Sequence, residues 1–446
     1  MYQRIQAFAT RLLANPLIRR VVKNSAYLFS ATGVSAALSM LQGILAARLL
    51  GVEQFGVLGA ITLFTSVINK LISFRMNELV IKYVGDYTAR NDTRRAAAVY
   101  KVASLTEAVS SLIAFALFVV LAPLGAQLFA KNPATRDWFL IYGVIILGNL
   151  FFESSLGLLQ YFDQFSRIAK IQIAQSAFTL FLIVIVFLLR GGVIEVLVAY
   201  MLGKILYAGL ISAYALLEAH RQWGRGWWRA RLSLLKDQRR DLARFAISTN
   251  LSASINLVNK DSELLWVSAL RTPVEAGYYK LALALANIAL LPVAPLPQAT
   301  YPELSRESAQ GNWDNVRYVL RQGSRLGFLY TSMVVAGLIF LGNWVIRTFY
   351  GAEFLPAYPA LIIMLFGFLI ANTFYWNRTA LLALNRPDYP TKVNLSAALV
   401  KIVLALLLIP RYGYIASAGL LAGYYAFSIG LNVRKVYREL DAKQFA

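Results

Sequence analysis

The chain has 446 residues, of which 58% are hydrophobic, and it carries 44 Lys and Arg against 22 Asp and Glu, a net charge of +22. A soluble domain is only about 45–50% apolar even when glycine is counted, so the composition excludes a soluble protein and indicates a polytopic membrane protein. Cysteine is absent and His220 is the single histidine, which excludes disulfides and Cys-metal sites and disfavours a membrane transferase that depends on histidine.

The N-terminal residues 1–23 are basic and precede the first apolar segment. Their apolar side chains recur at near-helical spacing, which predicts a short interfacial helix. Twelve apolar segments of about 18–25 residues follow, and each is long enough to span a bilayer. The first is too long for a signal peptide, so we expect it to remain as a membrane helix. The predicted spans are 24–47, 54–74, 97–121, 138–160, 168–189, 193–217, 245–269, 276–300, 319–341, 357–383, 390–409 and 414–433.

Basic residues in the connecting segments set the predicted orientation. If the N-terminus is cytoplasmic, the cytoplasmic segments hold about 30 Lys and Arg and the opposite loops hold about 7. Because short basic loops stay on the cytoplasmic side, both termini are expected to be cytoplasmic. The loops on the other side are all short, so we expect no large external domain.

The strongest boundary in the chain is the segment 218–244, which places Arg and Trp side by side. That pattern is typical of a linker at the membrane interface, with the rings at headgroup level and the charges toward water. Two interpretations stay open, a simple orientation anchor and a lipid-binding patch. The predicted organisation is an N-terminal segment 1–23, a six-helix lobe 24–217, the linker 218–244, a six-helix lobe 245–433 and a cytoplasmic tail 434–446.

The two halves resemble each other weakly at an offset of about 220 residues. The motif VEQFG at 52–56 corresponds to VEAG at 274–277, and 89–104 aligns without gaps with 309–324. Six is an even number of spans, so both halves enter the membrane in the same sense and form a parallel repeat. The predicted fold is an all-α integral membrane protein with 12 transmembrane helices in two parallel-repeat six-helix lobes around a central cavity.

One stretch, 250–265, places three charges in four positions inside an apolar segment, namely Lys260, Asp261 and Glu263. A lone charge at the centre of a bilayer helix costs about 2.5–3.5 kcal/mol on insertion scales, so these residues should face a bundle interior or a wet cavity. On a helix, Asn256, Lys260 and Glu263 share one face. Two interpretations stay open: Lys260 and Glu263 neutralise each other as a structural pair, or the group binds substrate or a coupling ion.

Polar side chains in other spans extend this pattern, because several lie on polar or aromatic stripes and basic residues outnumber acidic ones. The simplest interpretation is one water-filled cavity with cationic walls, which would take an anion such as a phosphate and whose tyrosines suit sugar rings. The alternative for Lys70, Lys101 and Lys401 is that they snorkel to a cytoplasmic interface. The candidate substrate-binding residues are Lys260, Lys280, Lys204, Arg378, Lys70, Lys101, Lys401, Asn256, Asn287 and Asn69, and the candidate ion-coupling carboxylates are Asp261, Glu263, Glu107 and Glu153.

Three motifs resemble a known family. AARLLGVEQFGVLGA at 46–60 resembles the first-loop signature of the polysaccharide flippases of the multidrug/oligosaccharidyl-lipid/polysaccharide exporter superfamily. KNSAYLFS at 23–30 is similar to the start of those proteins, and VEAGYYKLALAL at 274–285 resembles the matching signature of their second half. The resemblance covers about residues 23–435.

The resemblance implies a Wzx-type flippase of O-antigen or exopolysaccharide biosynthesis. Such a protein moves undecaprenyl-pyrophosphate-linked oligosaccharide from the cytoplasmic to the outer leaflet of a bacterial inner membrane. We expect alternating access coupled to H⁺ or Na⁺, without a cofactor, a bound metal or nucleic acid. The expected partners are the anionic lipid-linked oligosaccharide, membrane lipids and the polysaccharide polymerase or chain-length machinery.

Three other functions are weighed against this one. A multidrug antiporter of the same superfamily would have an acidic or apolar cavity, and the intramembrane lysines argue against that. A lipid-linked peptidoglycan precursor flippase typically has two extra spans. An O-antigen polymerase or ligase would carry a large outer loop with catalytic Arg or His, and no such loop is predicted here.

Overall fold

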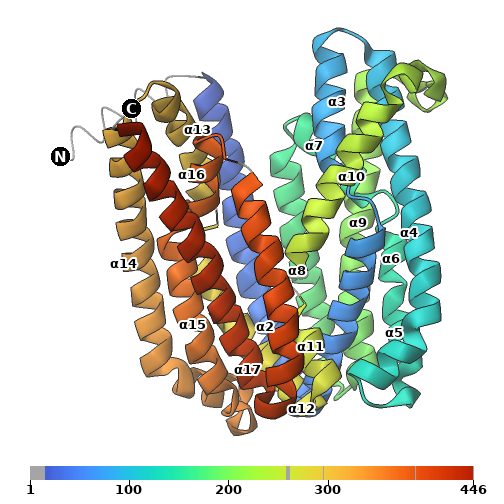
Figure 1. Ribbon diagram of the computed structural model, residues 1–446. Helices are drawn as coiled ribbons and strands as arrows, with labels where there is room; N and C mark the ends of the chain where they lie inside the picture. Colours follow the sequence, from blue (N-terminus) through green and yellow to red (C-terminus); the bar gives the residue numbers. More distant parts are fainter. Residues whose placement is uncertain (1–15, 258–261, 295, 387, 445–446) are drawn as a thin grey trace. The chain divides into compact units, whose positions relative to one another are not determined.

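In the computed structural model, residues 16–257, 262–294, 296–386 and 388–444 are described, and within those ranges every regular element is a helix (Figure 1). The N-terminal half holds α2 (Pro16–Ile72), α3 (Asn77–Ala89), α4 (Thr93–Phe129), η1 (Pro133–Thr135), α5 (Arg136–Gly143), α6 (Ile145–Gly148), α7 (Phe152–Tyr161), α8 (Phe165–Leu188) and α9 (Val193–Trp223). Two 3-10 turns follow, η2 (Trp227–Arg229) and η3 (Leu232–Gln238).

The C-terminal half begins with α10 (Arg239–Asn256), which runs beside α3 (Figure 1). Its remaining elements are α11 (Glu263–Leu270), α12 (Pro273–Ala286), η5 (Asn287–Leu290), α13 (Leu296–Ala309), α14 (Trp313–Val345), the π-helical turn η6 (Ile346–Tyr350), η7 (Ala352–Phe354), α15 (Ala357–Thr373), α16 (Asn377–Ala383) and α17 (Asp388–Gln444).

Two of these elements are pairs of helices joined at a glycine. Gly51 in α2 has φ 69°, and Gly413 in α17 has φ 64°. Only glycine adopts this left-handed region without strain, so the chain changes direction there without a separate loop. The predicted spans 24–47 and 54–74 thus lie on either side of Gly51, and 390–409 and 414–433 lie on either side of Gly413.

Eight helical stretches of the described chain are long and apolar enough to cross a membrane. They are Ser30–Ala89, Thr93–Phe129, Pro133–Tyr161, Phe165–Leu188, Val193–Trp223, Trp313–Tyr350, Ala357–Ala383 and Asp388–Lys443. The prediction of a multi-pass, all-α membrane protein is therefore confirmed, while the count of 12 spans stays a prediction.

Four predicted spans are interrupted in the structure. The span 357–383 is divided between α15 and α16. The span 138–160 is divided into α5, α6 and α7, because Glu107 accepts hydrogen bonds from the free backbone N–H groups at the start of α7. The span 276–300 is divided into α12, η5 and α13, and Pro292 within the break has no N–H to continue a helix. The span 245–269 is divided between α10 and α11, and residues 258–261 are outside the described ranges.

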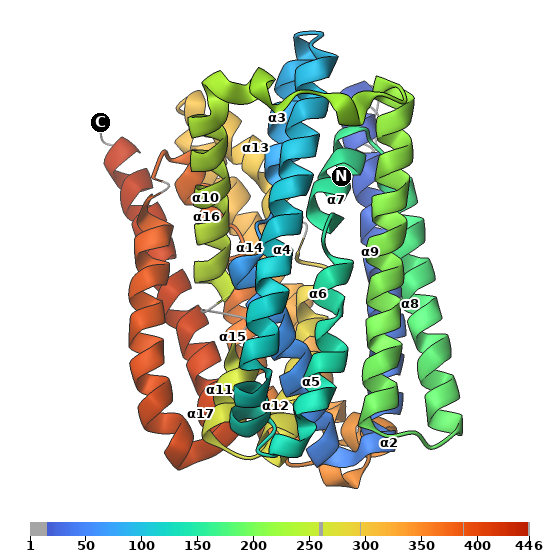
Figure 2. The same ribbon diagram turned by 90° about the vertical axis from the view of Figure 1, so that its right-hand side faces the viewer.

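The chain packs as two compact units. Unit one contains the described residues up to Gly43, Ile68–Val120 and Leu140–Leu251. Unit two contains Ile44–Val67, Leu121–Phe139 and the described residues from Ser252 onward. Within unit one, α8 and α9 pack along their length (Figure 2). Within unit two, α15 packs against both α14 and α17. The predicted lobe boundaries at 217 and 245 concern chain order and stay a prediction.

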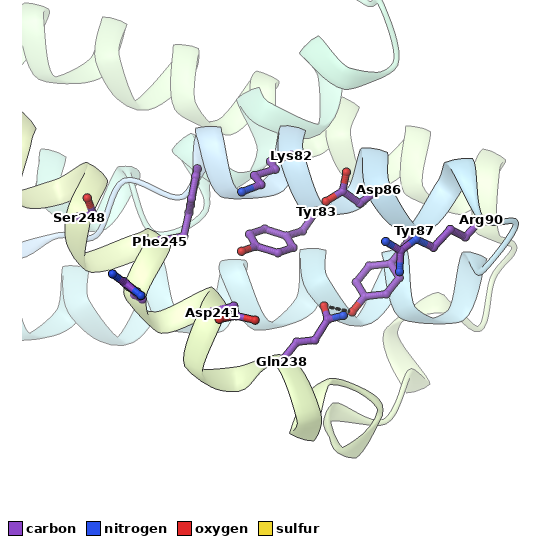
Figure 3. Close-up of a pocket in the computed structure, with 10 residues that line it drawn as sticks. Lys82, Tyr83, Asp86, Tyr87, Arg90, Gln238, Asp241, Phe245 and Ser248 are labelled. Carbon is purple, nitrogen blue, oxygen red and sulfur yellow. Dashed lines mark hydrogen bonds between the residues drawn. The ribbon is translucent and has the colours of Figure 1, made fainter. Parts of the chain in front are cut away.

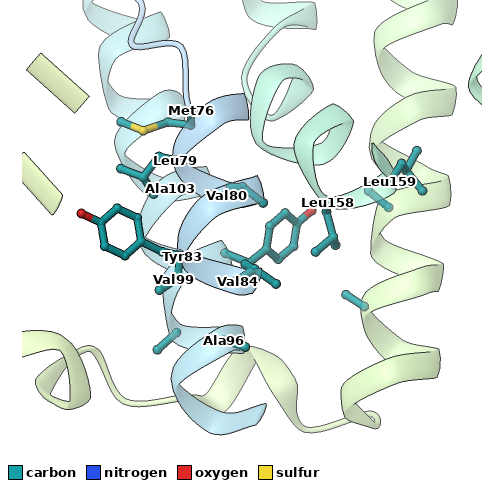
Figure 4. Close-up of a cluster of buried hydrophobic side chains, with 14 of the residues drawn as sticks. Met76, Leu79, Val80, Tyr83, Val84, Ala96, Val99, Ala103, Leu158 and Leu159 are labelled. Atoms are coloured by element: carbon teal, nitrogen blue, oxygen red, sulfur yellow. The ribbon is translucent and has the colours of Figure 1, made fainter. Parts of the chain in front are cut away.

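Each unit has a buried apolar core. In unit one, α3 has buried side chains on two of its sides. Met76 and Leu79 point to one side, and Val80 and Val84 point to the other, toward Leu158 of α7 (Figure 4). In unit two, Leu304, Leu320, Trp376 and Leu440 join α13, α14, α16 and α17. These cores fix the helix ends that carry the polar residues described next.

Candidate functional site

The predicted site residues fall into separate groups. Those of unit one are Asn69, Lys70, Lys101, Glu107, Glu153 and Lys204, and those of unit two are Glu263, Lys280, Asn287, Arg378 and Lys401. Lys260 and Asp261 lie outside the described residues, and the side chain of Asn256 is not described.

The charged cluster of unit one consists of Lys70, Arg75, Glu78, Glu153 and Lys204. Glu153, half-buried at the start of α7, is attracted by Arg75 and Lys70 and repelled by Glu78. Lys204 of α9 lies close enough to Lys70 to repel it. Three cations and two carboxylates, from α2, the α2–α3 linker, α3, α7 and α9, are therefore linked by electrostatic interactions, with a net positive charge that favours an anion.

An aromatic side chain and an amide adjoin the charged cluster. Tyr207 of α9 lies within electrostatic range of Glu153 and packs against Phe152 with ring centroids 5.3 Å apart. The Oδ1 atom of Asn69, one residue before Lys70, is buried and has no hydrogen-bond partner within the described part of the chain. A buried acceptor without a donor is unusual and calls for a ligand or a water, while the Tyr207 ring adds an aromatic surface near Glu153.

Arg75 is a member of this cluster that the sequence analysis missed, because it was counted as a cytoplasmic loop residue. The short linker Ser73–Met76 between α2 and α3 holds it in place. The backbone N–H of Arg75 donates to Asn250 Oδ1 of α10 at 2.8 Å, and that of Phe74 donates to Ser110 Oγ at 3.0 Å. Asn69 and Ser73 share a polar face of the predicted span 54–74, and this face leads to Arg75 and could have indicated it.

Glu107 lies behind the charged cluster and supports it. Its side chain is fully buried in α4 and accepts from the backbone N–H groups of Glu153 at 2.7 Å and Ser154 at 2.9 Å. A carboxylate at a helix N-terminus satisfies unpaired donors and interacts favourably with the helix dipole. Since Glu107 holds the backbone of Glu153 itself, it acts as a positioning residue for that carboxylate.

Lys101 has a different role in the fold. Its Nζ donates to the carbonyl oxygen of Ala230 at 3.3 Å, between η2 and η3. The lysine therefore ties α4 to the Trp-rich linker. This contact agrees with the interpretation that Lys101 lies near an interface.

In unit two, Lys401 and Glu263 form an ion pair, and both side chains are buried. Lys401 Nζ also lies 5.4 Å from the centre of the Tyr424 ring. Glu263 thus has a cation from α17 as its partner. The suggested pairing with Lys260 lies outside the described residues. Burial of Lys401 inside the protein argues against the alternative that it snorkels to an interface.

Lys280 is half-buried in α12 and is held by α2. Its Nζ donates to the Phe55 carbonyl oxygen at 3.2 Å and lies 3.9 Å from the centre of the Phe55 ring. By contrast, Arg378 and Asn287 are exposed, and their side chains have no hydrogen bond or ion pair with the described part of the chain. Arg378 and Asn287 are therefore available to a ligand, whereas Lys280 already has protein partners.

A polar pocket of about 490 Å³ lies between α3 and α10 in unit one (Figure 3). Its walls carry Lys82 and Asp86 from α3 and Asp241 from α10, and the hydroxyl of Tyr87 donates to Gln238 Oε1 across it. Lys82 Nζ lies 4.6 Å from the centre of the Phe245 ring. Both signs of charge line this pocket, so it has less preference for an anion than the charged cluster.

The chain matches the family model described as "Polysaccharide biosynthesis protein" over residues 21–307. It is 22% identical over 347 residues to "Inner membrane protein YghQ" of Escherichia coli (strain K12), a match that covers 77% of this chain and 96% of YghQ.

Two solved structures show the fold. The lipid II flippase MurJ in an inward closed conformation has a TM-score of 0.70 at 17% identity, with 94% of this chain and 90% of MurJ covered. An inward-facing multidrug resistance MATE family transporter of the MOP superfamily has a TM-score of 0.69 at 12% identity, with 92% and 96% covered. The chain is thus a multi-pass membrane protein with the MOP-superfamily fold, and it belongs to the polysaccharide biosynthesis protein family.

Proposed function

We propose that this protein is a flippase that moves undecaprenyl-pyrophosphate-linked oligosaccharide across a bacterial inner membrane by alternating access. The observation that supports the proposal is the charged cluster, in which Lys70 and Arg75 attract Glu153 and Lys204 of α9 adds a third cation near Lys70. A pyrophosphate and its sugars cannot cross hydrocarbon unaided, and cations with aromatic neighbours offer them a polar path. The membership in a polysaccharide biosynthesis family supports the same substrate class.

We propose that an ion gradient or the membrane potential drives the cycle, with H⁺ or Na⁺ as the coupling ion. Glu153 is the best-supported carrier, because it is half-buried and is attracted by Arg75 and Lys70, the cations that an anionic substrate would also contact. Binding of a cation at Glu153 and binding of the substrate at Lys70 and Arg75 would then depend on each other. An interior-negative potential contributes about 2.3 kcal/mol per charge per 100 mV, and it favours outward movement of an anionic headgroup.

The location in the inner membrane, with both termini cytoplasmic, is part of the proposal. The relative YghQ carries the name of an inner membrane protein, and the distribution of basic residues supports the orientation. The lipid-linked oligosaccharide and membrane lipids are the proposed partners, with the polysaccharide polymerase or chain-length machinery as the consumer of the flipped product.

The test is transport in proteoliposomes that contain the full chain. A fluorescent undecaprenyl-pyrophosphate oligosaccharide is placed in one leaflet, and its movement is followed by loss of quenching by a membrane-impermeant reagent. We expect flipping that depends on an imposed potential or ion gradient and that Lys70→Gln and Lys204→Gln reduce at least tenfold. Lys170→Gln, the same change at an exposed site outside the cluster, should have little effect. Absence of flipping, or transport of a cationic dye instead, would overturn the proposal in favour of an antiporter.

A further inference from the structure

A second cavity, of about 580 Å³, lies on another face of α10 and is called the apolar pocket here. Its walls come from α3, α4, η3 and α10, and include Met76, Leu79, Val102, Ala103, Leu242 and Ile247. Cavities of this size hold small-molecule ligands in many proteins, where pockets span about 300–1,000 Å³. It lies wholly within unit one and shares no residue with the charged cluster.

The inner wall of the apolar pocket is buried and mostly apolar. Met76, Leu79 and Ala103 are buried core residues, and Figure 4 shows them gathered on one side of α3. Apart from the two cations at its rim, the polar side chains of the lining are Thr106 and Ser233. A buried water needs two to four polar partners, and the apolar residues that make up most of the wall offer none. The suitable occupant is therefore an apolar chain.

The mouth of the apolar pocket faces an apolar exterior. Ile247 at the mouth is 57% exposed, and Val109, farther along α4, is also 57% exposed. Side chains of this kind on the outside of a membrane protein face lipid acyl chains rather than water. An acyl chain from the bilayer thus has direct access to the cavity.

Two cations lie on the rim of the apolar pocket. Lys236 and Arg239 line it, both are exposed, and neither has an acidic partner among the described residues. The same linker carries Trp228, which is 53% exposed and has the Arg229 guanidinium 5.0 Å from its ring centre. Exposed Trp and Arg side by side are typical of the lipid headgroup layer. The rim of the apolar pocket therefore lies at the depth of the lipid phosphates, and the cavity lies at the depth of the acyl chains.

We propose that the apolar pocket is a binding site for one anionic phospholipid, with an acyl chain in the cavity and the phosphate between Lys236 and Arg239. The two unpaired cations select an anionic headgroup over a zwitterionic one. A long polyprenyl chain would leave most of its length outside a cavity of this volume, so the occupant is a phospholipid rather than the carrier lipid. The bound lipid joins η3 of the linker to α3 and α4. This inference does not depend on the proposed transport function.

The test is lipid retention by the purified full chain in native mass spectrometry. Phosphatidylglycerol and phosphatidylcholine with the same acyl chains are titrated in parallel, and a photoreactive group in the phosphatidylglycerol chain maps the site. We expect one tightly held phosphatidylglycerol, crosslinked to peptides of α3, α4 or α10. The double variant Lys236→Gln/Arg239→Gln should weaken retention at least tenfold. The matched double variant Arg225→Gln/Arg240→Gln, at exposed linker positions outside the pocket, should not.

Two filling variants test the cavity itself. Ala243→Trp adds a large side chain at an exposed wall position, and Ile247→Asp places a negative charge at the mouth. Because two variants are used, the test does not depend on the folding of one of them. Both should abolish the specific adduct. Equal retention of the two lipids, crosslinks outside the pocket, or wild-type retention by both filling variants would overturn the proposal. Displacement of phosphatidylglycerol by an equal or lower concentration of undecaprenyl phosphate would do so too, and would assign the pocket to the carrier lipid.

Discussion

Gly56 of α2 and Gly277 of α12 each lie against the backbone of the other helix. A Cβ atom added at Gly56 would lie 1.9 Å from the Pro273 carbonyl oxygen, and one added at Gly277 would lie 2.3 Å from the Val52 carbonyl oxygen. The two glycines belong to the motifs VEQFG and VEAG that the internal repeat relates. The repeated motifs therefore pack on each other reciprocally within unit two, and each glycine allows the other helix to approach.

Replacing either glycine by alanine should destabilise the protein. Even one methyl group has no space at these two positions, and overpacking of this kind costs about 1–3 kcal/mol, sometimes more. We expect Gly56→Ala and Gly277→Ala each to lower the thermal unfolding midpoint in detergent. Gly423→Ala, a helical glycine with nothing within 4 Å of the added Cβ, is the control. Unchanged midpoints in both variants would show that the two helices can separate freely.

The ion pair between Lys401 and Glu263 should be worth more to stability than an exposed pair. Removal of one partner from a buried pair leaves an uncompensated charge and costs about 3–5 kcal/mol, so Lys401→Met and Glu263→Gln should each destabilise strongly. The double variant should recover part of the loss. Thermal unfolding of the four proteins gives the coupling energy directly.

The exposed pair Arg317–Asp441 provides the comparison for that cycle, with N–O distance 2.7 Å and 59% exposure of the aspartate side chain. Pairs of this kind contribute about 0–1 kcal/mol. If Lys401→Met left stability unchanged and reduced only substrate binding, Lys401 would be a binding residue rather than a structural one.

Lys204→Gln should separate binding from stability. Lys204 and Lys70 repel each other, so removal of one charge should leave the unfolding midpoint unchanged or raise it. The affinity for an anionic headgroup should fall at least tenfold, because one of the cations that attract it is lost. Binding is measured by titration with undecaprenyl pyrophosphate and stability by thermal unfolding. A fall in both quantities together would argue for a structural role.

Glu107→Ala should destabilise the start of α7 and displace Glu153. Two buried N–H groups would lose their acceptor, at about 1–3 kcal/mol for each unsatisfied group. The matched comparison is Glu195→Ala, since Glu195 also accepts from a backbone N–H, that of Gly192 at 2.7 Å, but at an exposed helix start. Water replaces the lost acceptor there, so the loss should be smaller. Hydrogen exchange at Glu153 and Ser154 distinguishes local release of α7 from global unfolding.

Much of the architecture follows from the sequence alone. Long apolar segments have few alternatives to membrane helices, because backbone groups in hydrocarbon must be satisfied within the helix. The reversals at Gly51 and Gly413 fall between predicted spans, where the apolar pattern is interrupted. Lys70, Lys204 and Glu153 could be chosen as candidates because a charge inside an apolar segment needs a polar environment.

Only the tertiary structure decided which partner each charge finds. Glu263 pairs with Lys401, more than a hundred residues away, and Lys280 donates to the backbone of Phe55 on another helix. Helical periodicity predicts which side chains share a face of one helix. It does not predict which distant helix packs against that face. The breaks around α7 were missed for the same reason, since the acceptor that stabilises its free N-terminus is Glu107, a residue of a different helix.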